Sequence, residues 1–240
     1  SGELDGMKWE GHKPKLLLKS IIRHHGHDVP KDMIVEDIWP GSSAKAGEKN
    51  FKINLHRLRK ALEGDLGENP AFSYIHLESG VVSMDSDLVT IDVNEFVRFC
   101  RKGHECYSRE MMEDALEWYD KACELYRGDF LEEEPYTEWL EQERISLRDE
   151  YIYVLTKKAE INEELDRIPI AVRDLKKVIE KNPLQESAYQ NLMILYADSG
   201  ETNAALQVFD QCRDMIRQEL GVEPDPRTVR LYREIRSRHG

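Results

Sequence analysis

A run of basic side chains between residues 44 and 60 is the part of this sequence whose residue types point most directly to chemistry. The segment AKAGEKNFKINLHRLRK contains six Lys and Arg residues against one acid, Glu48, which gives a net charge of +5 over 17 residues. Arg can bind guanine bidentately, Asn can bind adenine, and Lys and Arg can pair with phosphates. The segment therefore predicts a helix that enters the major groove of duplex DNA.

Helical spacing separates the apolar from the basic residues of this segment. At about 100° per residue, one face carries an apolar stripe that can pack on a core, formed by Phe51, Leu55, Leu58 and Leu62. A second stripe is basic and consists of Lys45, Lys49, Lys52, His56 and Arg59, extended by Arg57 and Lys60. The alternative is an ordinary solvated helix, but such helices interleave Glu with Lys at i, i+4. We therefore expect one face to be buried and the other to bind a polyanion.

The net charge of the whole chain conceals this basic segment. The 240 residues contain 34 Lys and Arg against 47 Asp and Glu, a formal net charge of −13, which by itself argues against nucleic acid as a partner. Residues 1–62 contain 12 basic and 8 acidic residues, a balance of +4, whereas residues 63–240 contain 22 and 39, a balance of −17. We expect a small basic face for DNA and a large acidic body for protein.

Several other classes of protein find no support in the sequence. No Walker A loop, nucleophile elbow, glycine-rich dinucleotide turn or HExxH motif occurs, so we predict neither an enzyme nor a cofactor. No apolar run approaches about 18 residues and the chain does not open with a signal-peptide pattern, so we expect a cytoplasmic protein without a membrane partner. The four cysteines form no CxxC pair and are expected to be reduced and mostly buried.

Two groups of His and Cys residues raise the question of a metal site. They are His24, His25 and His27 at a predicted helix end, and Cys100, His104 and Cys106 on a predicted helix. A zinc site needs about four convergent ligands, and neither spacing supplies a fourth. The second group lies beside Phe96 and Phe99, whose positions together with Cys100 indicate core. We therefore predict no metal.

The elements that must position the basic helix come before and after it. Residues 13–25 are expected to form a helix with Leu16, Leu17 and Ile21 on one face, and residues 31–39 a second, shorter helix that ends at Pro40. After the basic helix, residues 72–84 are rich in Tyr, Ile and Val around a Ser-Gly turn and predict a β-hairpin. Three helices followed by a hairpin is the order of a winged helix-turn-helix domain.

From Asp92 to the end the pattern is helical and repeats itself. Three similar helices contain a small-then-large apolar pair, at Ala115-Leu116, Ala171-Val172 and Ala205-Leu206. The last two pairs are 34 residues apart, the tetratricopeptide period. The first two are 56 apart, an excess of 22 that matches the length of GDFLEEEPYTEWLEQERISLRD. We predict a mainly α chain in which this half is a tetratricopeptide-like (TPR-like) α-solenoid with one insertion.

Two further features of the helical half leave alternatives open. The acidic run Glu132, Glu133 and Glu134 is expected in a loop, either solvated or in contact with a basic surface of RNA polymerase. Aromatic residues either line a concave groove or lock neighbouring helices together, and they are Trp118, Tyr119, Trp139, Tyr151, Tyr153, Tyr189 and Tyr196.

Motifs in both halves resemble known families. WPGSSAKAGEKNFKINLHRLRKALE, with Trp39-Pro40 and the run from Arg57 to Leu62, resembles the DNA-binding domain of OmpR/PhoB-type regulators. GDFLEEEPYTEWLEQERISLRDEY, KNPLQESAYQNLMILYADSGETNAAL and RQELGVEPDPRTVRLYREI resemble the bacterial transcriptional activation domain. Together the halves are similar to Streptomyces antibiotic regulatory protein (SARP)-type activators. The resemblance implies a winged-helix DNA-binding domain over residues 1–90 and an activation domain with TPR-like repeats over residues 91–240.

The resemblance also implies partners and residue roles. A SARP-type activator binds promoter DNA, usually as a dimer on direct repeats, and its helical domain contacts RNA polymerase or a neighbouring subunit. The residues that fall on exposed recognition positions are Lys49, Lys52, Asn54, His56 and Arg57, and those expected to pair with phosphates are Arg59 and Lys60.

Two departures from the family pattern and one rival function remain. Only SGELDGMKWEG precedes the first helix, so we expect the family's N-terminal sheet to be truncated or reduced to one hairpin. The hairpin offers Glu78, Ser79 and Gly80 at its tip, which favours contact with the DNA backbone over insertion into the minor groove. The rival is a scaffold that has lost DNA binding and holds a peptide or small molecule in its TPR-like groove, a hypothesis that the acidic bulk motivates.

Overall fold

The computed structural model divides into two compact units. It describes residues 9–24, 26–63, 73–134 and 137–238. The first unit comprises Ser1–Val97 and Phe130–Arg144, and the second comprises Arg98–Asp129 and Ile145–Gly240. The domain boundary at residue 90 stays a prediction, but the first unit includes a segment, residues 130–144, that lies far beyond it in the sequence.

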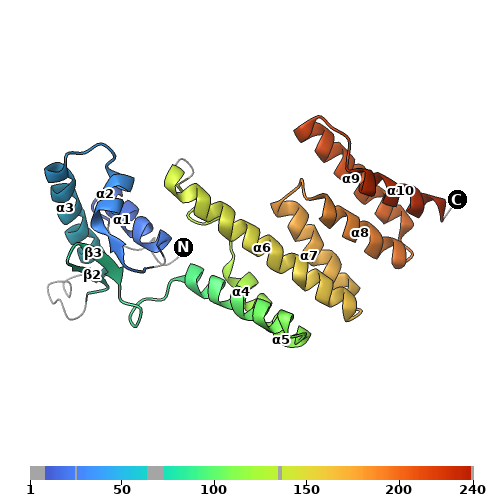
Figure 1. Ribbon diagram of the computed structural model, residues 1–240, viewed down its shortest axis with the longest axis horizontal. Coiled ribbons are helices and arrows are strands. Elements are labelled where there is room, and N and C mark those ends of the chain that lie inside the picture. Colours follow the sequence, from blue (N-terminus) through green and yellow to red (C-terminus); the bar gives the residue numbers. More distant parts are fainter. Residues whose placement is uncertain (1–8, 25, 64–72, 135–136, 239–240) are drawn as a thin grey trace. The chain divides into compact units, whose positions relative to one another are not determined.

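Between residues 9 and 84, the described residues of the first unit form three helices and three short strands (Figure 1). The helices are α1 (His12–Arg23), α2 (Lys31–Ile38) and α3 (Ala44–Glu63). The strands are β1 (Val29–Pro30), β2 (Ile75–Glu78) and β3 (Val81–Met84). The three predicted helices and the hairpin are confirmed, although His25 and Phe72, at the ends of the predicted ranges, lie outside the described residues.

The strands form one antiparallel sheet in the order β1-β3-β2. Ser79 and Gly80 connect β2 to β3 with positive φ angles of 51° and 83°, as a tight two-residue hairpin turn requires. Strand β1, which was not predicted, adds a third strand to the predicted hairpin, because Val29 of β1 pairs with Val82 of β3. Residues 1–8, where the family's N-terminal sheet would begin, lie outside the described part of the chain.

The apolar core of the first unit lies where the three helices meet the sheet. It consists of Leu17, Leu18, Ile21, Val29, Ile34, Ile38, Phe51, Leu55, Leu58, Ile75 and Val82. The apolar stripe predicted for α3 is therefore confirmed, with Leu62 partly buried at its end. On α1 the stripe is shifted by one position, because Leu18 is buried and Leu16 only partly so. Burial of each such side chain stabilises the fold by about 1.5–3 kcal/mol.

In the described part of the chain after the sheet there are seven helices, of which α4 and α6 contribute residues to both units. Their bounds are α4 (Asp92–Ser108), α5 (Met112–Leu125), α6 (Glu138–Glu164), α7 (Ile168–Lys181), α8 (Glu186–Asp198), α9 (Thr202–Leu220) and α10 (Pro226–Ser237). Within the second unit, consecutive helices pack side by side (Figure 1). The predicted repeat is confirmed, because Ala115, Ala171 and Ala205 are all fully buried at equivalent places on α5, α7 and α9.

The aromatic residues of the second unit mainly join its helices. Tyr119 and Tyr189 are buried, and the rings of Tyr126 and Tyr151 stack with their centroids 4.0 Å apart. Tyr153 of α6 is exposed, but its ring still contacts the ring of His104 on α4 edge-on, with the centroids 5.0 Å apart. Close packing of this kind, rather than a lined groove, accounts for most of the aromatic content.

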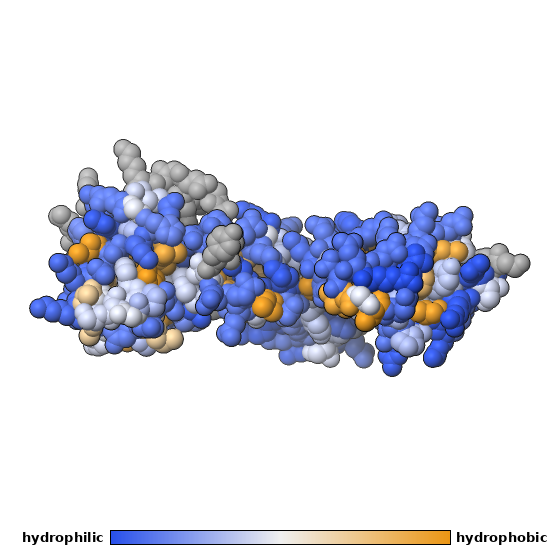
Figure 2. Space-filling view, turned by 90° about the horizontal axis from the view of Figure 1, so that it is seen from above, coloured by the Kyte–Doolittle hydropathy of each residue, from blue (hydrophilic) through white to orange (hydrophobic). Residues whose placement is uncertain are grey.

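One face of the described chain, drawn in Figure 2, is mostly hydrophilic. On the face drawn in Figure 2, apolar side chains form small separate patches among polar ones. None of the described helices combines the length and the apolar character that crossing a membrane requires.

Gly103 provides a test of the packing between α4 and α5. A Cβ at this position would lie 2.3 Å from Cε1 of Tyr119, a fully buried side chain whose hydroxyl is 2.8 Å from Nδ1 of His104. Gly103→Ala should therefore lower the free energy of unfolding by about 1–3 kcal/mol, although Ala is the better helix former by about 1 kcal/mol. Urea unfolding followed by circular dichroism measures the change. Glu105→Ala, at an exposed position on the same helix, is the control, and equal stability of Gly103→Ala and wild type would contradict this packing.

Candidate nucleic-acid interface

The exposed face of α3 carries the basic residues that the sequence singles out. The exposed basic side chains are Lys45, Lys49, Lys52, His56, Arg57 and Lys60. They lie opposite the stripe that α3 buries in the core, so the helix presents cationic groups to solvent while its apolar face holds it in place. This is the arrangement that the segregated stripes predicted.

Few acidic groups neutralise this face. Glu48 pairs with Lys52 at 3.0 Å and with Lys31 of α2 at 3.4 Å, and hydrogen bonds from these two ammonium groups lower the pKa of the Glu48 carboxyl. Among the described residues, Lys45, Lys49 and His56 have no ion pair. The face therefore keeps an excess of positive charge that can attract a polyanion.

Arg57 and Lys60 converge on a single carboxylate. Nζ of Lys60 lies 3.2 Å from Oε1 of Glu10, and Nε of Arg57 lies 3.7 Å from Oε2 of the same residue. All three side chains are exposed, so this contact is screened by water and contributes little to stability. It shows that the two cations, one turn apart on α3, can hold one anion between them.

Two predicted contact residues lie elsewhere. The prediction that Asn54 is exposed is wrong: its side chain is buried, with 8% of the residue accessible, and its amide donates to the carbonyl oxygen of Asn50 at 2.7 Å. Arg59 is half-buried, and its Nε and Nη2 donate to the carbonyl oxygen of Ile75 at 3.0 and 2.6 Å. We correct its expected role accordingly, because this guanidinium ties α3 to β2 instead of extending freely toward a phosphate.

Sequence reasoning missed one residue on this face, Ile53. It is 41% exposed and is flanked by Lys49 at i−4 and Arg57 at i+4. The sequence does contain a signal for it, because Ile53 is an apolar residue that does not fall on the helical positions of the apolar stripe. In a helix whose other large apolar residues are buried or partly buried, such a residue must point away from the core.

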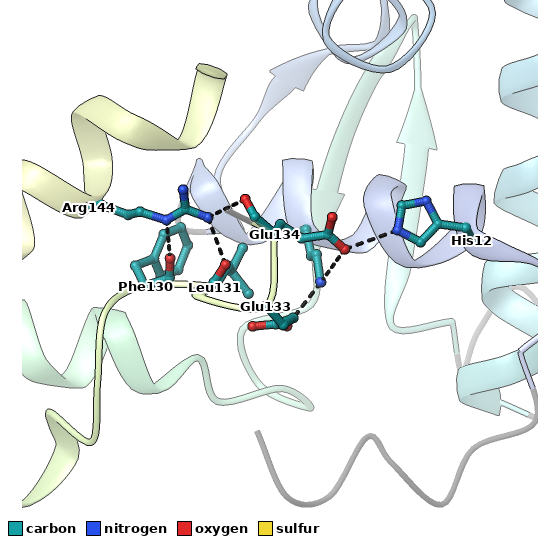
Figure 3. A network of polar contacts seen from close by, with 7 residues as sticks. His12, Phe130, Leu131, Glu133, Glu134 and Arg144 are labelled. Carbon is teal, nitrogen blue, oxygen red and sulfur yellow. Dashed lines mark hydrogen bonds and ion pairs between the residues drawn. The ribbon is translucent and has the colours of Figure 1, made fainter. Parts of the chain in front are cut away.

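An acidic segment from beyond α5 packs on α1 within the first unit (Figure 3). Nζ of Lys19 lies 2.9 Å from a carboxylate oxygen of Glu133 and 2.9 Å from one of Glu134, and Nε2 of His12 lies 3.0 Å from the same Glu134 oxygen. Lys19 is buried, with 8% of the residue accessible. Among the residues that the structure describes, two of the three acids in the run thus form ion pairs with α1, and Glu132 does not. The alternative that the whole run is simply solvated is therefore wrong.

Arg144 fixes the shape of this segment. Its guanidinium is buried and donates from Nε to the carbonyl oxygen of Phe130 at 2.9 Å. Nη2 donates to the carbonyl oxygens of Leu131 at 2.8 Å and of Glu134 at 2.7 Å (Figure 3). Three backbone acceptors on one side chain hold the loop in the form that presents the two glutamates to Lys19.

The local electrostatics follow from this pairing. Burial raises the pKa of the Glu133 and Glu134 carboxyls, but the hydrogen bond and charge of Lys19, together with a backbone hydrogen bond at Glu133 and the contact with His12 at Glu134, outweigh burial and leave both below their ordinary value of 4.5. Both glutamates are therefore charged at neutral pH and neutralise Lys19. Because α1 packs against α3, this segment supports the helix on which the basic face rests.

His104 and the two buried cysteines of the second unit have structural surroundings. His104 lies between the hydroxyl of Tyr119 and a carboxylate oxygen of Glu150, at 2.8 and 2.7 Å. Cys100 and Cys212 are buried, and burial raises the pKa of the Cys212 thiol to about 12. In the part of the chain that the structure describes, no three His, Cys, Asp or Glu side chains are grouped to hold a metal ion.

Comparison with known proteins shows which protein family the chain matches. The family model described as bacterial transcriptional activator domain matches residues 91–236. The chain is 25% identical over 226 residues to regulatory protein DnrI of Streptomyces peucetius, covering 93% of this chain and 83% of DnrI. It is 23% identical over 223 residues to transcriptional regulatory protein MoaR1 of Mycobacterium tuberculosis, covering 93% of this chain and 71% of MoaR1.

A solved structure shares the fold over almost the whole chain. It is Mycobacterium tuberculosis EmbR in complex with a low affinity phosphopeptide, with a TM-score of 0.76 and 19% identity. The match covers 96% of this chain and 60% of the EmbR chain, so this chain spans about three fifths of that structure.

Removing one carboxylate tests the contact between the acidic segment and α1. Glu134→Gln should lower the free energy of unfolding at neutral pH by about 1–3 kcal/mol, because Lys19 and His12 both lose a charged acceptor in a partly buried place. The folded-state pKa of Glu134 is lowered, so its contribution is present above 4.5 and is lost as the pH falls through the folded value. The stability difference from wild type should therefore shrink in acid, where wild-type Glu134 is protonated too.

Glu132→Gln is the matched control, because Glu132 is exposed and belongs to the same acidic run. Urea unfolding at neutral pH and at a series of acidic pH values that extends below the folded-state pKa of Glu134 gives the comparison. An equal loss for both variants, or a difference that persists in acid, would show that the Glu134 contact does not stabilise the unit.

Proposed function

Because the chain belongs to the bacterial transcriptional activator domain family, we propose that it is a transcription activator that binds duplex DNA through the exposed face of α3. Its relatives DnrI and MoaR1 are regulatory proteins, and the family consists of transcriptional regulators rather than enzymes. The proposal assigns DNA recognition to the first unit and protein contacts to the second.

The observation that carries the proposal is the two-faced α3. The order α1, β1, α2, α3, β2, β3 supports a winged helix-turn-helix of the OmpR/PhoB type, in which the third helix enters the major groove. In this proposal Arg57 and His56 face base edges, with Arg57 suited to bidentate contact with guanine. Lys45, Lys49, Lys52 and Lys60 pair with phosphates.

The contact of Arg57 and Lys60 with Glu10 supports binding of phosphate at this end of α3. The two cations already hold one carboxylate between them, at 3.7 and 3.2 Å. A DNA phosphate offers the same kind of charged oxygen, and binding it requires that Glu10 be displaced. Glu10 therefore competes with DNA in this proposal.

The helical second unit is proposed to bind protein. The second unit, residues 98–129 and 145–240, contains 21 basic and 25 acidic residues, a balance of −4, so it has no excess of positive charge that would attract DNA. The expected partners are RNA polymerase and a second copy of the chain on direct repeats, and the expected location is the cytoplasm.

Selection from random duplexes by mobility shift tests the function. Enrichment of one sequence, present as a direct repeat, is the expected result and would also give the stoichiometry. Failure to retain any duplex at low salt would contradict DNA binding and would favour the rival scaffold that holds a peptide in its TPR-like helices.

Arg57→Ala should weaken binding to the selected site by about 1–3 kcal/mol and relax the preference at one base pair. The physical reason is the loss of a bidentate contact that only one base can make. Titration of selected and scrambled duplexes by fluorescence anisotropy measures both effects. Arg230→Ala, an exposed arginine of α10, is the control, and equal losses on both duplexes would remove Arg57 from base recognition.

Lys60→Ala should weaken binding to every duplex and reduce the slope of log K against log salt by about 0.9, because one phosphate contact fewer releases one counterion fewer. Glu10→Gln should act in the opposite direction and strengthen binding to all sequences, since it removes the competing carboxylate. A salt titration of the three proteins checks both signs. An unchanged slope for Lys60→Ala would exclude this phosphate contact.

A further inference from the structure

Ile53 lies on the side of α3 that faces away from the core. Leu62, in the apolar stripe, follows nine residues later, about two and a half turns along the helix, and so lies on the opposite side. Lys49, Arg57 and Lys60, at i−4, i+4 and i+7, share the side of Ile53. An apolar side chain thus stands in the middle of the basic face.

Isolated exposed apolar residues are ordinary on protein surfaces and need no explanation by themselves. Met33, Leu88 and Val97 are exposed in the first unit as well. Ile53 differs from these by its surroundings, because among the α3 side chains that the structure describes it is the one large apolar group that is exposed. Its neighbours on the same side are cations that can pair with phosphates, which directs the face to a polyanion rather than to an apolar partner.

The major groove of DNA offers one apolar group to such a residue. Base-pair edges there present hydrogen-bond donors and acceptors, and thymine adds the C5-methyl group. An isoleucine cannot hydrogen-bond, so it can distinguish base pairs only by apolar contact or by exclusion. Resting on the proposed DNA-binding function, we infer that Ile53 contacts the C5-methyl of a thymine and so sets a preference for an A·T pair at one position of the site.

The size of the effect follows from the area removed from water. Burying one methyl-sized group is worth a change in affinity of about fourfold. Replacing one thymine by uracil deletes only this methyl and leaves Watson–Crick pairing intact. Removal of this one methyl from the DNA can therefore be combined with Ile53→Ala in the protein to test whether the two groups contact each other.

The experiment measures dissociation constants for the full chain on the duplex recovered by random selection, with each thymine replaced by uracil in turn. Wild type should bind about fourfold more weakly at one such position. Ile53→Ala should bind the thymine and uracil duplexes equally at that position, because the partner of the methyl is gone. Alanine favours the helix, so this variant is expected to fold. Leu88→Ala, which removes another exposed apolar side chain from the same unit, should keep the fourfold effect.

Other outcomes overturn the inference. If uracil has no effect at any position while wild type binds tightly, or if the effect persists in Ile53→Ala, Ile53 does not contact a thymine methyl. Loss of the effect in Leu88→Ala as well would remove the assignment to Ile53, and a changed sedimentation coefficient of free Ile53→Ala would show that a second copy covers this residue instead. If no duplex is recovered, the DNA-binding function itself fails, which is a result distinct from tight binding without methyl dependence.

Discussion

The buried ammonium group of Lys19 is the constraint on which the first unit depends. A charge taken out of water costs several kcal/mol unless a carboxylate lies beside it, and α1 places Lys19 where 8% of the residue is accessible. The carboxylates come from Glu133 and Glu134, the latter 115 residues further along the chain. The carboxylates that neutralise Lys19 in the described part of the first unit therefore come from a distant segment, whose shape Arg144 holds.

This dependence reaches the basic face through packing. α1 is held by the acidic segment on one side and packs against α3 on another, while Arg59 bonds α3 to β2. The two stripes of α3 are then fixed in space: the apolar residues lie in the core, and the cations face solvent. The same segment belongs to the insertion that interrupts the helical repeat, so one stretch of sequence lengthens α6 and completes the unit that presents the basic face.

Much of this architecture is local in origin and could be predicted. The 3.6-residue period marked the three helices and the buried stripe of α3, the Ser-Gly turn between β-branched residues marked the hairpin, and the small-large pairs at Ala171 and Ala205 marked the repeat. Strand β1 was not predicted, because two residues are too few to show the alternating pattern of a strand. They form a strand only because they pair with β3. The ion pairs of Lys19 with Glu133 and Glu134 were not predicted for a similar reason, because the residues around an acidic run do not indicate which distant cation it will contact.

What the sequence determined by itself was charge, periodicity and order: a basic helix, a hairpin after it, and then a set of helical repeats. Only the tertiary structure decided which residues at the edges of those patterns are buried and which are exposed. Asn54 and Arg59 lie at the edges of the apolar stripe, where the helical period does not determine whether a side chain is buried or exposed. Both side chains donate hydrogen bonds to nearby backbone carbonyl oxygens, Asn54 to Asn50 and Arg59 to Ile75. Ile53 was left exposed because the core contacts only the opposite side of α3. Burial depends on what packs against each flank, and that information lies in distant parts of the chain.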